Sequence, residues 1–294
     1  MSLFQRAARL LFAGLALTLS TAGIAGEALP PATQLQQFTV ESRAVAETRR
    51  INVYIPDTYA ADTTLRLPVL YMPDGGLQED FPHVASTLHT AIGSGAMRPF
   101  LLVGIENTQR RRDLTPPTQV EADRKIAPQV GGSAAFRQFI RDELMPQVST
   151  RYRTTPETAI IGESLAGLFI VETLLHEPRL FDTYIALDPS LWWNAKALPL
   201  QAKEALARHA LTGRTVYLTT SQEPGIVEGT AMLAEVLGHL DTAGLRSTYR
   251  PRTDLRHDNI YRTMAPVILR AVFPPMSTPA PTQAPELARP MHAP

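Results

Sequence analysis

Short apolar runs alternate with longer amphipathic segments along most of the chain. Seven runs, most of them rich in Val, Ile and Leu as strands buried on both faces of a sheet are, cover residues 51–55, 68–72, 100–105, 158–161, 184–187, 215–219 and 247–249. Helical spacing of apolar side chains occurs between or after them, over residues 134–148, 165–175, 230–243 and 260–273. This alternation predicts an α/β fold with a mostly parallel central sheet and helices on both faces.

Two stretches fall outside the alternation. Residues 108–132 are polar and contain Pro116, Pro117 and Pro128, and a loop of this length within a compact domain usually serves a site. Residues 277–294 are rich in proline and have little apolar surface to bury, which predicts a disordered tail. We therefore expect the folded domain to occupy residues 26–276.

The N-terminus has the pattern of a signal peptide. Arg6 and Arg9 precede an apolar stretch over residues 10–19, and small residues follow as far as Ala25. The apolar stretch is too short to span a bilayer comfortably, and no stop-transfer charges follow it. We expect residues 1–25 to be removed, with no stable membrane insertion afterwards and a periplasmic or secreted location.

Composition narrows the function further. The chain has 294 residues, which is enough for a sizeable core, and 28 basic side chains balance 28 acidic ones. Such a chain lacks the basic footprint of a nucleic-acid-binding protein. There is no cysteine, which excludes disulfides, thiolate metal sites and a cysteine nucleophile. We expect no metal ion and no organic cofactor.

The segment Gly162-Glu163-Ser164-Leu165-Ala166-Gly167 contains the strongest candidate for chemistry. Ser164 directly follows an apolar run and precedes a helical pattern, which is the strand-to-helix turn that exposes the nucleophile of α/β-hydrolases. Small residues are needed two positions before and after the serine. Gly162 meets this requirement, whereas Ala166 replaces the usual glycine and makes the turn tighter. The alternative is a turn with a purely structural role.

The other members of a catalytic triad should follow the serine in the order acid, histidine, each in a loop after a strand. His257 lies after the last predicted strand, whereas the other six histidines lie in helical patterns, in the tail or before Ser164. Glu223, which follows the run at 215–219, is the favoured acid. Asp188, which ends the run at 184–187, is the alternative, and either carboxylate could instead cap a helix or be solvated.

An oxyanion hole in this arrangement combines the backbone amide after the nucleophile with an amide from an early loop. Leu165 supplies the first. Gly75 and Gly76 follow the predicted strand at 68–72, and glycines there let the backbone approach a substrate oxygen closely. A tight turn is the alternative explanation for these two glycines.

Several motifs over residues 35–273 occur together. They are Val53-Tyr54-Ile55-Pro56, Pro68-Val69-Leu70-Tyr71 before Asp74-Gly75, Val103-Gly104-Ile105, Asn107-Thr108, Arg112-Asp113-Leu114-Thr115-Pro116, the turn at Ser164, and Asp188-Pro189-Ser190-Leu191-Trp192-Trp193. With them the chain resembles the putative-esterase family of α/β-hydrolases, which includes siderophore esterases of the enterobactin type and esterase D-like enzymes.

The resemblance implies a nucleophile at Ser164, a base at His257 and an acid near Glu223. Two positions depart from the family pattern: Ala166, and Asp188 where a serine is expected. The second places another carboxylate near the site, and some siderophore esterases resemble serine–histidine dyads, so the acid stays open.

The resemblance also places Arg110, Arg112 and Trp193 around the substrate pocket. The alternatives are a tryptophan that fills the core and arginines on a solvated loop. Arginines that face the site would favour an anionic or metal-chelate substrate, such as a catecholate siderophore.

These observations lead to one hypothesis and two rivals. The hypothesis is a serine carboxylic-ester hydrolase that acts through an acyl-enzyme on a small-molecule ester, of the siderophore type or another acyl ester. The first rival is an acyltransferase of the same fold, in which an alcohol other than water accepts the acyl group. The second is a periplasmic binding protein that has kept the fold without catalysis.

Overall fold

A computed structural model describes residues 30–240 and 244–275 of the chain. The predicted signal peptide and the predicted tail from residue 277 lie outside these described residues. Within the described residues, no helix is both long enough and apolar enough to cross a membrane.

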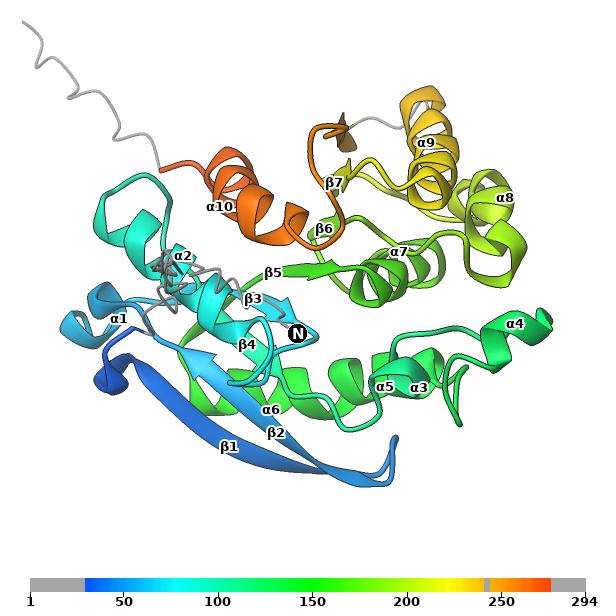
Figure 1. The fold of residues 1–294 in the computed structure, drawn as a ribbon. Helices are drawn as coiled ribbons and strands as arrows, with labels where there is room; N and C mark the ends of the chain where they lie inside the picture. The colour runs from blue at the N-terminus through cyan, green and yellow to red at the C-terminus, as the bar shows by residue number, and fades with distance from the viewer. Residues whose placement is uncertain (1–29, 241–243, 276–294) are drawn as a thin grey trace, which may run out of the picture.

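The described residues build one eight-stranded sheet with the order β1-β2-β4-β3-β5-β6-β7-β8 (Figure 1). β2 pairs with β1 and β4 in antiparallel fashion, and every other neighbouring pair is parallel. The strands are Leu35–Ser42, Glu47–Tyr54, Leu67–Met72, Leu101–Ile105, Thr154–Glu163, Thr183–Leu187, Thr215–Thr220 and Arg246–Pro251. The mostly parallel sheet that the apolar runs predict is therefore confirmed.

Successive side chains of the central strands belong in turn to two separate hydrophobic clusters, one on each face of the sheet. In β3, Val69 and Tyr71 belong to one cluster and Leu70 and Met72 to the other. This follows from the period of two along a strand, and burial of both faces explains why the strand reads as a continuous apolar run.

Helices cover both faces of the sheet (Figure 1). The cluster around Leu70 includes side chains of α2 (Phe81–Gly93) and α10 (Ile260–Val272). The opposite cluster includes side chains of α5 (Ser133–Gln138), α6 (Met145–Arg151), α7 (Leu165–His176), α8 (Trp193–Ala207) and α9 (Pro224–His239). The predicted helix over residues 134–148 is divided, because a π-helical segment, Phe139–Leu144, separates α5 from α6.

The segment from 108 to 132 is mostly irregular, as predicted, with two single-turn helices, α3 (Arg110–Asp113) and α4 (Glu121–Arg124). A fully buried ion pair anchors α3, because Arg49 of β2 lies 2.6 Å from the Asp113 carboxylate. A short helix α1 (Asp57–Ala61) follows β2, and a 3-10 turn, Ala32–Gln34, precedes β1.

Candidate active site

Ser164 lies between β5 and α7 in a backbone conformation that few residues other than glycine adopt. Its φ of 59° and ψ of −118° cost about 1–3 kcal/mol, which the surrounding structure has to supply. Two backbone hydrogen bonds hold the turn, from the Ser164 amide to the Leu187 carbonyl and from the Ser190 amide to the Ser164 carbonyl, both 3.0 Å. The turn is fixed against the end of the neighbouring strand β6.

The alanine at position 166 fits this turn because position 162 has no side chain. A Cβ added to Gly162 would lie 2.6 Å from the Ala166 Cβ and 3.2 Å from the Ile170 Cδ1. At Gly167, an added Cβ would lie 2.9 Å from the Pro189 Cα. The departure from the usual pattern at Ala166 therefore leaves the geometry of the turn intact, and the requirement for glycine rests on positions 162 and 167.

A chain of hydrogen bonds links Ser164 to His257 and Asp188. The His257 Nε2 lies 3.2 Å from the Ser164 Oγ, and the His257 Nδ1 lies 2.6 Å from the Asp188 Oδ2. His257 belongs to the loop between β8 and α10, and Asp188 directly follows β6. A carboxylate that accepts a hydrogen bond from Nδ1–H favours the imidazole tautomer with its proton on Nδ1. In this tautomer Nε2 is unprotonated and can take the serine proton.

Asp188, the alternative acid, is the residue that contacts His257, and the preference for Glu223 is wrong in this respect. Asp188 is fully buried, and its Oδ1 accepts a hydrogen bond from the Ser221 amide at 2.6 Å. Glu223 is exposed at the N-cap position of α9, and among the groups that raise the His257 pKa its charge is the weakest. The left-handed φ of 46° at Asp188 accompanies this placement of its side chain.

The environment of His257 favours its charged form. The hydrogen bond that His257 donates to Asp188 raises the pKa of the imidazole above its ordinary value of 6.5, and partial burial opposes this rise. The negative charges of Glu163 and Asp188 raise the pKa further. The same interactions stabilise an imidazolium that forms transiently during proton transfer.

Ser190 is a second hydroxyl beside the candidate nucleophile. Its Oγ lies 3.4 Å from the Ser164 Oγ, and the residue is buried. Ser190 belongs to the motif at residues 188–193. The sequence pattern indicated that this motif is characteristic of the family, but it predicted no role for Ser190. The Ser164 hydroxyl thus has two polar neighbours, an imidazole nitrogen and a hydroxyl.

The three backbone amides that were predicted to form the oxyanion hole differ in whether they already have a hydrogen-bond acceptor. Leu165 is the first residue of α7, and the first amides of a helix have no acceptor within it. The Gly75 amide, in contrast, donates to the Ile105 carbonyl at 2.9 Å, so the prediction for Gly75 is wrong. The Gly76 amide donates to the Glu79 Oε2 at 2.7 Å, and it can reach a substrate only after that carboxylate moves away.

Gly75 has a structural reason to be glycine. An added Cβ would lie 2.2 Å from the Ile105 amide nitrogen and 2.3 Å from the Gly104 Cα. The loop after β3 and the end of β4 therefore approach each other at backbone distance, which only glycine permits.

Both arginines that were predicted to contact substrate form ion pairs within the protein. Arg110 donates to both carboxylate oxygens of Asp74, from Nε at 2.7 Å and Nη2 at 2.8 Å. Arg112 pairs with Glu47 at 2.6 Å and with Asp113 at 2.7 Å. Their charges are compensated, and they mainly fix the position of α3.

Trp193 lies in the core, so its predicted place in the substrate pocket is wrong. Only 1% of the residue is exposed, and its Nε1 donates to the Pro116 carbonyl at 3.0 Å. The neighbouring Asn194 accepts a hydrogen bond from the Gln119 amide at 2.9 Å. Trp193 and Asn194 therefore fasten the 108–132 segment to the start of α8.

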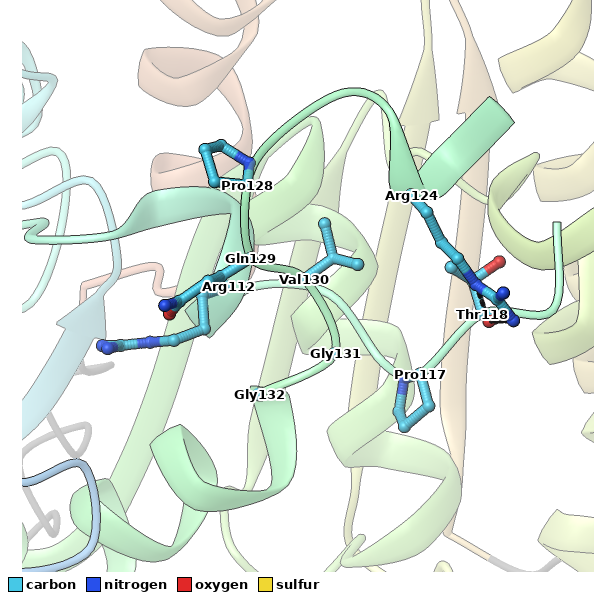
Figure 2. Close-up of a pocket in the computed structure, with 9 residues that line it drawn as sticks. All are labelled: Arg112, Pro117, Thr118, Arg124, Pro128, Gln129, Val130, Gly131 and Gly132. Carbon is cyan, nitrogen blue, oxygen red and sulfur yellow. Dashed lines mark hydrogen bonds between the residues drawn. The ribbon is translucent and has the colours of Figure 1, made fainter. Parts of the chain in front are cut away.

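The 108–132 segment lines two cavities of about 610 Å³ and 530 Å³. Figure 2 shows the larger one, with the Arg112 and Arg124 side chains on opposite sides of it. Arg111 lines the smaller cavity. In the described part of the chain, Arg111 and Arg124 bond to carbonyl oxygens of the backbone or an amide side chain and pair with no carboxylate. The sequence did not single out these two arginines, which are exposed.

Glu163, Asp188 and His257 form a compact group of potential ligand atoms, all within 4.8 Å of one another. The imidazole nitrogens of His257 already face Asp188 and Ser164. A metal ion bound through either nitrogen would replace one of these two hydrogen bonds. The geometry therefore fits acid–base chemistry better than a resident metal.

The strand order, the antiparallel β2 and the turn at Ser164 define an α/β-hydrolase fold. The sequence pattern of the family described as "Putative esterase" matches residues 42–228, more than half of the chain. The chain belongs to this family.

Similar proteins include two curated siderophore esterases. The ferri-bacillibactin esterase BesA of Bacillus subtilis is 28% identical over 184 residues, which are 56% of this chain and 60% of the relative. The siderophore triacetylfusarinine C esterase of Aspergillus fumigatus is 34% identical over 149 residues, 47% of this chain and 49% of the relative. The matches thus span about half the length of these relatives.

A solved structure of similar fold is the IroE-like serine hydrolase from Shewanella oneidensis. It superposes with a TM-score of 0.72 at 26% identity and covers 81% of this chain and 80% of its own. The likeness thus extends over more of the chain than the matches to the two curated relatives do.

Proposed function

We propose that this protein is a serine esterase that hydrolyses carboxylic esters through an acyl-enzyme. The observation that carries the proposal is the hydrogen-bonded chain from Ser164 through His257 to Asp188. Membership of the esterase family supports it. The three residues have the geometric roles of nucleophile, base and orienting acid.

In the proposed reaction the Ser164 Oγ attacks the ester carbonyl while the His257 Nε2 takes the hydroxyl proton. The tetrahedral intermediate places its oxyanion near the Leu165 amide, whose hydrogen bond stabilises the negative charge. His257 then gives the proton to the leaving alcohol, and the acyl group stays on Ser164. A water molecule, activated by His257, hydrolyses the acyl-enzyme and regenerates the serine.

We propose an anionic ester of the siderophore type as the substrate class. Two relatives are named as siderophore esterases, and Arg111 and Arg124, which bond to carbonyl oxygens, line the cavities of the 108–132 segment. Guanidinium groups bind carboxylate and catecholate oxygens through charge-assisted hydrogen bonds. An exported protein would meet such chelates outside the cytoplasm, as the N-terminal pattern suggests.

The proposal is tested with purified protein, a panel of aryl esters and ferric siderophores, and a Ser164→Ala variant as the blank. We expect hydrolysis by the wild-type protein and a loss of about 10⁶-fold in the variant, as for removal of a triad serine elsewhere. A fluorophosphonate probe should label the wild-type protein once and the Ser164→Ala variant not at all. Full hydrolysis by the variant, with its fold intact, would refute the assignment.

The same assay separates the two rival functions. Added alcohols that divert the acyl group into new esters, with little free acid, would identify an acyltransferase. Ligand binding without turnover or fluorophosphonate labelling would identify a binding protein. Hydrolysis as the dominant outcome supports the esterase.

A further inference from the structure

Glu163 is the residue directly before the candidate nucleophile, and the proposed reaction gives it no role. It ends β5 at the carboxyl edge of the sheet. One of its carboxylate oxygens lies within 4.8 Å of both a ring nitrogen of His257 and a carboxylate oxygen of Asp188. The imidazole therefore has two carboxyl groups beside it, of which only Asp188 is hydrogen-bonded to it.

The Glu163 side chain is half-buried. Its Oε1 is buried and has no hydrogen-bond partner among the described residues. Arg110 is the nearby cation, but its two hydrogen bonds to Asp74 compensate its charge. Burial of a carboxylate that lacks a partner is costly, so such a group retains its proton unless a positive charge forms beside it.

The titratable groups around Glu163 come from several elements. Four of them have charges that shift the pKa of Glu163, namely His257 before α10, Asp188 after β6, Asp80 before α2 and Arg110 of α3. The fifth is Tyr261 of α10, whose pKa is raised by the charge of Glu163. The pKa of Glu163 is raised to about 8, mainly by burial; the positive charges of His257 and Arg110 oppose this rise, and the negative charges of Asp80 and Asp188 add to it. In return, a negative Glu163 raises the pKa of His257.

We propose that Glu163 is a positioning residue that stabilises the charged imidazole of His257 when Ser164 gives up its proton. This proposal depends on the esterase function proposed above. Attack by Ser164 converts His257 from neutral to positive, and an ionised carboxylate within 4.8 Å lowers the energy of that state relative to the ground state. Asp188 orients the ring, and Glu163 adds charge stabilisation that depends on its own ionisation.

The test uses the isosteric variant Glu163→Gln and two measurements. The first is the NMR titration of the His257 ring, assigned with a His257→Gln variant. Strongly interacting groups titrate as a pair, so the wild-type ring signal should show two inflections, the second near pH 8. In Glu163→Gln we expect a single inflection, at a pH at least about half a unit below the midpoint of the wild-type His257 titration.

The second measurement is the pH profile of kcat/KM for a neutral aryl ester. The wild-type rate should rise in two steps, as His257 and then Glu163 lose their protons. Glu163→Gln should keep the first step and lose the second, so that its rate is about tenfold to a hundredfold lower at pH 9 and within about threefold at pH 6.5. Asp258→Asn is the matched control, because Asp258 is next to His257 in sequence but exposed and paired with Arg256.

A purely structural role predicts a different pattern, namely an equal loss at every pH and an unchanged His257 titration. That result would overturn the proposal, as would a single inflection in the wild-type titration, which does not depend on the folding of Glu163→Gln. The NMR measurement needs no substrate. A failure of the proposed esterase function therefore appears as absent turnover with the two inflections still present, and the two failures are distinguishable.

Discussion

The substitution Asp188→Asn tests the acid of the proposed triad most directly. Asparagine has the shape of aspartate and tolerates the left-handed φ of 46° at this position. Its side-chain oxygen can keep the hydrogen bond from the Ser221 amide that Asp188 Oδ1 accepts at 2.6 Å. Its NH2 group then faces the His257 Nδ1, where the carboxylate oxygen is now 2.6 Å away.

This exchange reverses the roles of the ring nitrogens. With an NH2 donor opposite, Nδ1 becomes the acceptor and Nε2 carries the proton, so His257 can no longer accept a proton from Ser164. A serine protease with the equivalent change loses about 10⁴-fold in kcat, and we expect a similar loss here, equivalent to about 5 kcal/mol of transition-state stabilisation. The fold should persist, because the hydrogen bond to Ser221 is kept.

The assay is steady-state hydrolysis of an aryl ester at pH 8, with thermal unfolding of each variant as the folding control. Glu223→Gln is the comparison variant, and we expect its kcat/KM to stay within about threefold of wild type, because Glu223 is exposed and its charge is screened. A large loss in Glu223→Gln together with a small loss in Asp188→Asn would refute the assignment of Asp188.

Two further predictions concern substrate charge and the packing of the turn. Arg111→Gln and Arg124→Gln should each raise KM for an anionic ferric siderophore about threefold to tenfold and leave KM for a neutral aryl ester unchanged; equal effects on both substrates would contradict the charge argument. Gly162→Ala should lower the free energy of unfolding by about 1–3 kcal/mol through overpacking against Ala166, because the two Cβ atoms would lie 2.6 Å apart. Adding Ala166→Gly should recover most of this loss in a denaturant titration, and no recovery would show that the clash lies elsewhere.

The strands that form the core were predictable from the sequence, whereas one of the two edge strands was not. All seven predicted runs correspond to strands, β2 to β8. For the central strands this is because burial on both faces of a parallel sheet demands consecutive apolar residues, whereas β8 lies at an edge of the sheet and is mostly exposed. β1 was missed. Its sequence is Leu35-Gln36-Gln37-Phe38-Thr39-Val40-Glu41-Ser42, in which exposed and buried or partly buried positions alternate only from Phe38 onward. The strand lies at the edge of the sheet.

The helical spacing over residues 134–148 indicated the right face of the helix but not its interruption. The pattern requires only that Phe136, Phe139, Ile140 and Leu144 lie on one side, and all four are buried. A π-helical segment at 139–144 changes the turn locally without moving these side chains off that face, so hydrophobic spacing does not reveal it.

The choice of acid shows where reasoning from chain order ends. β6 and β7 are neighbouring parallel strands, so the residues that follow them, Asp188 and Glu223, both lie at the carboxyl edge of the sheet near Ser164. Chain order is identical for both, and only the direction of each side chain distinguishes them. The Asp188 amide bonds to the Thr219 carbonyl of β7, and with the left-handed φ its carboxylate is buried against His257. Glu223 directly precedes α9, whose first residue is Pro224, and is exposed. The backbone dihedral angles at single residues therefore decide which carboxylate contacts His257, and the order of residue types along the chain does not reveal them at Asp188.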